Sequence, residues 1–69
     1  MYARRNAITE EMIPEAKELV RKLREEFNGD SRVAAKNLNI PSPTVYSWFR
    51  GSYYPNLKRF NDLRKRYSY

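Results

Sequence analysis

Residues 30–51, DSRVAAKNLNIPSPTVYSWFRG, decide the fold of this 69-residue chain. Asp30 is a favourable helix N-cap, because its carboxylate can accept hydrogen bonds from the first free backbone N–H groups. After it, Val33, Ala34 and Leu38 are predicted to share one helical face. A helix this short is not stable alone in water, so neighbouring elements must hold it by packing. The stretch therefore predicts a short helix that depends on its partners.

A turn with the sequence LNIPSP separates this helix from a second one. Asn39 tolerates the left-handed backbone conformation better than most residues. The residue before each proline is pushed away from helical angles. Ser42 is therefore expected to be the N-cap, with Pro43 at the first helical position, where its missing N–H costs nothing. The second helix is predicted at residues 43–50, and Gly51 is expected to end it.

The second helix is predicted to have a buried face and a polar outer face. Val45, Trp48 and Phe49 recur at helical spacing and are expected in the core. The outer face carries hydroxyls and a guanidinium, groups that hydrogen-bond to base edges and phosphates, and a helix fits the DNA major groove. The candidate base-reading residues are Ser42, Thr44, Tyr46 and Ser47.

Helices are also expected on both sides of this stretch. Residues 9–27 are mainly helical by pattern, and Pro14 favours a separate turn before the helix proper. Asn56 is a candidate N-cap for a last helix with apolar side chains at helical spacing. The predicted fold is an all-α, compact bundle of four to five helices. It comprises an N-terminal arm at residues 1–8 and one domain at residues 9–69.

The composition excludes several classes of function. The chain has no Cys and no His, so it cannot form a disulfide or a zinc finger, and Cys or His nucleophiles are ruled out. Its adjacent carboxylates lie on charged helix faces, so we expect no enzyme, metal, cofactor or small-molecule ligand. No apolar run approaches the ~20 residues of a membrane span, and no signal-peptide core is present, so no membrane contact is expected.

Positive charge is concentrated in the second half of the chain, and the net charge is +6. Residues 1–29 hold six basic and six acidic groups, whereas residues 30–69 hold eight basic and two acidic groups. Such a local excess is typical of polyanion binding, although a solubilising surface is the plainer alternative. The candidate phosphate-contacting residues are Ser31, Arg32, Lys36, Arg50, Tyr53, Tyr54 and Lys58.

The basic N-terminal arm leaves two interpretations open. Arg4 and Arg5 could reach a phosphate or the minor groove, as the arms of some DNA-binding domains do. The alternative is a frayed terminus without a role in binding.

The run A-A-x-x-L-N-I-x-x-x-T-V-x-x-W-x-R-G-x-x-x-P at residues 34–55 resembles the lambda-repressor/Cro-like helix-turn-helix proteins, also called the xenobiotic-response-element family. The resemblance implies a small, repressor-like transcription regulator that binds double-stranded DNA in a sequence-specific manner. The helix-turn-helix would span residues 30–51, with its recognition helix in the major groove. Family members are typically cytoplasmic and nucleoid-associated, of prokaryotic or viral origin. The matching residues are Ala35, Leu38, Asn39, Ile40, Thr44, Val45, Trp48, Arg50, Gly51 and Pro55.

Two other functions remain open at this point. The run VAAKNLNIPSPTVYSW is also similar to the homeodomain-like helix-turn-helix of transposases, which implies a site-recognition domain of a transposase or recombinase. A protein-interaction module such as an antitoxin is the other alternative, because the C-terminal part is rich in tyrosine and aromatic residues are enriched at interfaces. A homodimer that reads two half-sites about 34 Å apart and a monomer are both compatible with the sequence.

Overall fold

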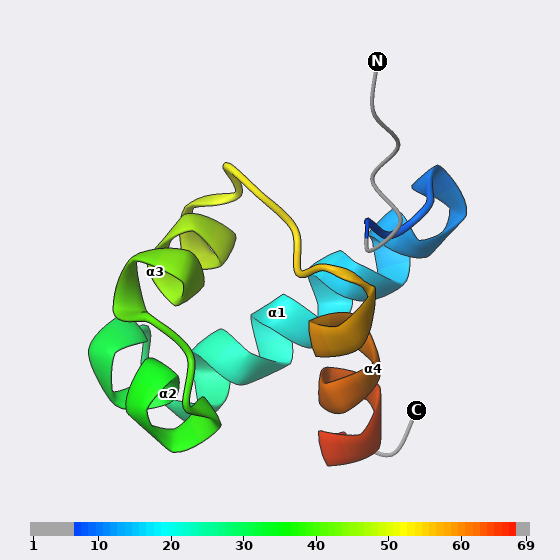
Figure 1. Ribbon diagram of the computed structural model, residues 1–69. Helices are drawn as coiled ribbons and strands as arrows, with labels where there is room; N and C mark the ends of the chain where they lie inside the picture. The colour runs from blue at the N-terminus through cyan, green and yellow to red at the C-terminus, as the bar shows by residue number, and fades with distance from the viewer. Residues whose placement is uncertain (1–6, 68–69) are drawn as a thin grey trace.

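A computed structural model describes residues 7–67, so the predicted contacts of Arg4 and Arg5 lie outside the described residues. Within 7–67 every regular element is helical, which confirms the predicted all-α class. The elements are a 3-10 turn η1 (Glu10–Met12), α1 (Ile13–Glu26), α2 (Ser31–Leu38), α3 (Ser42–Arg50) and α4 (Leu57–Arg66) (Figure 1).

Helix α1 runs through the middle of the molecule and contacts each of the other helices (Figure 1). Its face with Leu19 and Leu23 is fully buried. The small side chains of Ala34 and Ala35 let α2 lie close to α3, and this is the most extensive helix–helix contact in the described part of the chain. The core cluster comprises Ala16, Leu19, Val20, Leu23, Ala34, Ala35, Ile40, Val45, Trp48, Phe60 and Leu63.

The predicted faces of α2 and α3 need two corrections. Val33, which was expected to share a helical face with Ala34 and Leu38, is 46% exposed. Successive residues lie about 100° apart around a helix, so Val33 is turned away from the side on which Ala34 and Ala35 meet α3. Phe49 is only partly buried and packs at the margin of the core, whereas Trp48 is inside it.

Local sequence rules place most helix ends correctly. The turn η1 precedes the helix proper, with Pro14 in the first turn of α1, as predicted. The Asp30 side chain accepts hydrogen bonds from the backbone N–H groups of Arg32 and Val33, at 3.1 and 3.2 Å. Asn39 takes the left-handed conformation with φ 58°, which confirms its predicted role in the turn.

The predicted start of α3 was wrong by one residue. Pro41 is the N-cap, and Ser42 is the first helical residue and makes no capping hydrogen bond. Pro41 already has the extended ψ of 136° that a cap requires, and its carbonyl accepts from the N–H of Thr44 at 3.0 Å. The ring of Pro41 thus fixes the boundary that the hydroxyl of Ser42 was expected to fix.

Polar contacts attach the C-terminal end of α4 to the C-terminal end of α1. The Tyr67 hydroxyl donates to Glu26 Oε1 at 2.6 Å, and Arg66 Nε donates to the same oxygen at 3.2 Å. At the other end of α1, an ion pair joins Glu15 Oε2 in the first turn to Arg64 Nε of α4, at 2.8 Å. This Glu15 oxygen is shielded from solvent and receives no hydrogen bond of good angle, so charge attraction alone holds that pair.

Helix capping gives a direct test of the two predicted N-caps. Replacing Asp30 by Ala should lower the free energy of unfolding by about 1 kcal/mol, because two N–H groups of α2 lose their acceptor. Ser42→Ala is the matched control and should change stability little, because Ser42 caps nothing. Urea unfolding of both variants measures this, and an equal loss in the two would contradict the observed start of α3.

The junction at Glu26 should make stability depend on pH. Hydrogen bonds from Arg66 and Tyr67 hold the pKa of Glu26 below its ordinary value of 4.5. A lowered folded-state pKa stabilises the fold above pH 4.5, and that contribution disappears as the pH falls through the folded-state value. Glu26→Gln should therefore destabilise the protein at pH 7, and the difference from wild type should shrink below pH 4.5.

Unfolding curves across this pH range provide the measurement. The exposed Glu11→Gln on η1 is the matched control, because Glu11 forms no ion pair within residues 7–67. A destabilisation by Glu26→Gln that is independent of pH would contradict the role given to its charge.

Candidate nucleic-acid interface

Helix α3 is held at both ends, which fixes the direction of its outer face. Val45 and Trp48 anchor its inner face in the core. At its C-terminal end, Arg24 Nη1 of α1 donates to the carbonyl oxygen of Phe49 at 3.3 Å. A guanidinium at this position satisfies a free carbonyl and interacts favourably with the negative end of the helix dipole. The outer side chains of α3 are therefore presented from a rigid support.

The outer face of α3 carries the four predicted base-reading residues, but in different environments. Tyr46 is 53% exposed, and the Arg50 guanidinium lies 5.6 Å from the centre of its ring, within cation–π range. The Ser47 hydroxyl donates to the carbonyl of Thr44 at 2.6 Å, so its lone pairs are left to accept from a ligand. Ser42, in the first turn of α3, is half-buried.

An open groove of about 550 Å³ lies beside α3, between this helix, the loop 51–56 and the start of α4. The groove brings together four residues that were predicted to contact DNA, two from α3 and two from the loop. It also includes the guanidinium of Arg59 and the amide of Asn56, which the sequence did not identify as contact residues. These polar and aromatic lining residues are Thr44, Ser47, Tyr53, Tyr54, Asn56 and Arg59.

The loop 51–56 positions the two tyrosines of the groove. Gly51 ends α3 with φ 81°, a conformation that side chains with a Cβ rarely adopt. At the other end Pro55 is fully buried, and Asn56 caps α4 by accepting from the backbone N–H of Arg59 at 2.9 Å. Between these fixed points both Tyr53 and Tyr54 are exposed to solvent.

Arg59 was not predicted as a site residue because its location depends on the path of the loop. In the sequence it is one of several cations on the last helix, with no spacing that distinguishes it from Lys58. Only the return of the chain after Gly51 brings the first turn of α4 to the groove. Lys58, which was predicted to contact phosphate, does not line the groove, and its Nζ lies 3.3 Å from Asp62 Oδ2.

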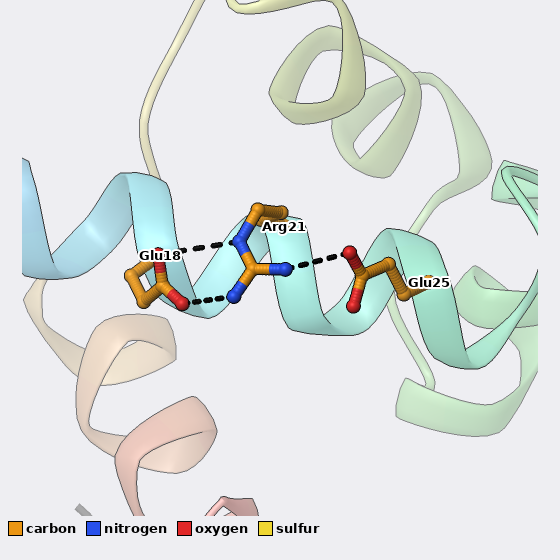
Figure 2. Close-up of polar contacts among 3 residues, drawn as sticks. All are labelled: Glu18, Arg21 and Glu25. Carbon is orange, nitrogen blue, oxygen red and sulfur yellow. Dashed lines mark hydrogen bonds and ion pairs between the residues drawn. The ribbon is translucent and has the colours of Figure 1, made fainter.

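Three arginines, one on α1 and two at the end of α4, are neutralised by glutamates of α1. Figure 2 shows Arg21 between two acidic side chains, with Nη1 2.6 Å from Glu25 and a bidentate contact to Glu18. These contacts raise the pKa of Arg21 and lower that of Glu18. Arg64 and Arg66 pair with glutamates of α1.

A second set of cations forms no ion pair within residues 7–67. Arg32 and Lys36 lie one turn apart on α2, and both are exposed. Within the described residues, the one polar or ring contact of Arg50 is with the Tyr46 ring. Arg59 lines the groove. Ser31 is half-buried in the first turn of α2. The structure therefore keeps uncompensated positive charge on α2, on α3 and at the start of α4. Lys17 and Arg24 of α1 and Lys65 of α4 also form no ion pair within residues 7–67.

The described residues 7–67 contain no group of three or more His, Cys, Asp or Glu side chains that could hold a metal ion. In the same part of the chain, no helix has the length and apolar character needed to cross a membrane. Comparison of the chain with protein-family models, with curated proteins and with solved structures finds no significant match.

Proposed function

We propose that the chain is a sequence-specific double-stranded DNA-binding protein, a small repressor-like transcription regulator that uses α2, the turn and α3 as a helix-turn-helix. The observation that carries this proposal is the separation of charge. Glutamates of α1 pair with Arg21 of that helix and with Arg64 and Arg66 of α4. The cations on α2, on α3 and in the groove form no ion pair within residues 7–67. Uncompensated cations around an exposed polar helix are what a phosphate backbone binds.

In this proposal the residues divide into two roles. Cations of α2 and α3 would contact phosphates on either side of the major groove, which sets the position of α3 without reading sequence. Arg50 is suited to this role, because its guanidinium lies 5.6 Å from the centre of the Tyr46 ring and has no carboxylate partner within residues 7–67 to occupy its donors. Tyr53, Tyr54 and Arg59 would extend the contact along the strand beside the groove.

Base reading would come from the outer face of α3. The Ser47 hydrogen is committed to the carbonyl of Thr44, so this hydroxyl would act as an acceptor. The base edges that donate in the major groove are adenine N6 and cytosine N4. Tyr46, which is 53% exposed, would add a polar hydroxyl and an apolar ring. Pro41 and Pro43 offer no side-chain donor, so DNA shape would carry part of the recognition.

In-vitro selection from a random duplex library tests the proposal. We expect enrichment of one consensus, which would be palindromic if two copies bind side by side. Failure to enrich any sequence, together with a stoichiometric protein partner from a pull-down, would overturn the proposal in favour of an interaction module.

Salt dependence of binding to the selected duplex gives a second test. About five phosphate contacts predict a slope of log K against log salt of roughly −4 to −5. Arg32→Gln should weaken binding to all duplex sequences alike and reduce the salt slope by about 1. Tyr46→Ala should relax the sequence preference at one base position. Lys17→Gln removes the same charge from α1 and is the matched control, expected to bind like wild type. A slope near zero, or equal effects of Arg32→Gln and Lys17→Gln, would count against the proposal.

A further inference from the structure

We propose that the groove beside α3 binds single-stranded nucleic acid, with unpaired bases stacked on Tyr53 and Tyr54 and the backbone held by Arg59. This goes beyond duplex recognition by α3 and does not depend on it. The lining chemistry, the charge and the rigidity of the loop support it in turn.

The groove offers flat aromatic surfaces to solvent. Tyr53 and Tyr54 are adjacent, and their residues are 67% and 38% exposed. Exposed neighbouring aromatics of this size in a small domain favour a ligand with a flat apolar face. Every nucleobase has such a face, so stacking on tyrosine is strong and tolerant of sequence. The rings of Pro41 and Pro43 line the same groove and add flat apolar surface.

The loop is fixed before any ligand arrives. The N–H of Ser52 donates to the carbonyl of Ser47 at 3.0 Å, and Pro55 is fully buried beyond the two tyrosines. Little backbone entropy is therefore lost when a base stacks, which favours binding by a short strand. A volume of about 550 Å³ falls within the roughly 300–1,000 Å³ of ligand-binding clefts.

Charge identifies the occupant as a polyanion. Arg59 is the cation of the lining, and within residues 7–67 no acidic side chain lines the groove. Thr44, Ser47 and Asn56 add polar atoms that can meet base edges or sugar hydroxyls. Aromatic-lined grooves also bind proline-rich peptides, but such peptides have no need of the +6 charge that lies in residues 30–69. Single-stranded nucleic acid matches both the rings and the charge.

The chain carries its own reporter for this site. Trp48 is the single tryptophan of the sequence, and it lines the groove while 5% exposed. A base that enters the groove changes the surroundings of the indole, so Trp48 fluorescence should respond to occupancy. A strand bound elsewhere on the surface leaves this signal unchanged.

The experiment titrates the full chain with an oligothymidylate of about eight nucleotides. Strand binding is followed by fluorescence anisotropy, and groove occupancy by Trp48 emission. We expect saturable binding with a matching change in Trp48 emission, and no such change with a blunt-ended duplex that lacks the sequence selected by α3. Single-strand binding without selection of any duplex sequence would support this proposal and overturn the one for α3.

Variants at Tyr53 separate stacking from hydrogen bonding. Tyr53→Ala should weaken oligothymidylate binding by about 5- to 100-fold, the range expected for loss of one stacked base. Tyr53→Phe keeps the ring and should bind within about twofold of wild type. If Tyr53→Phe weakened oligothymidylate binding as much as Tyr53→Ala, the hydroxyl and not the ring would make the contact, and the proposal would be overturned.

Variants of α4 separate a specific backbone contact from general charge. Arg59→Gln should weaken binding and reduce the salt slope by about 0.7. Lys65→Gln removes the same charge from the same helix outside the groove lining and should leave binding unchanged. Equal losses in the two variants, both folded by circular dichroism, would overturn the proposal. A change in Trp48 emission with a neutral proline-rich peptide, and none with oligothymidylate, would overturn it too.

Discussion

The packing of α3 through Trp48 is the constraint on which the rest of the structure depends. Helices α2 and α3 are both too short to persist alone in water. Each is held by burial against the other and against α1, and the small Ala34 and Ala35 make that approach close. The inner surface of Trp48 belongs to this core, and its remaining edge reaches the groove. The same side chain therefore supports the fold and forms part of the candidate interface.

Electrostatics divide the molecule into a neutralised scaffold and a charged face. On α1, Arg21 is enclosed by two glutamates, and other glutamates of this helix hold Arg64 and Arg66 of α4. Most of these ion pairs are exposed, and each adds little to stability. Their larger effect is on the field around the protein, because they cancel the charge of three arginines on α1 and at the end of α4 and leave the cations of α2, α3 and the groove unpaired. The polyanion-binding role proposed for that face depends on this cancellation.

The sequence predicted the features that rest on local chemistry. The caps Asp30 and Asn56, the left-handed Asn39 and the helix-ending Gly51 follow from neighbouring residues, and all were confirmed. The errors came where two local rules competed or where tertiary contact decides. Pro41 displaced Ser42 as a cap because its ring already provides the required backbone.

The remaining misses concern contacts between distant parts of the chain. Glu26 bonds to Arg66 and Tyr67, some 40 residues further along, and the spacing of charges along α1 does not reveal such distant partners. The groove was invisible in the sequence for the same reason. It forms only because the chain returns after α3 and brings Arg59 back beside Thr44 and Ser47.

The attachment of α4 gives the domain two levels of local stability. Among the described helices, the backbone of α4 comes close to α1 but not to α2 or α3. A small cavity of about 120 Å³ separates it from the turn between those two helices. Release of α4 from α1 would thus be a sub-global opening that leaves the α2–α3 pair in place. Such an opening would carry Arg59 away from the groove and widen it, so the population of this partly open state would set how often a bulky strand can enter.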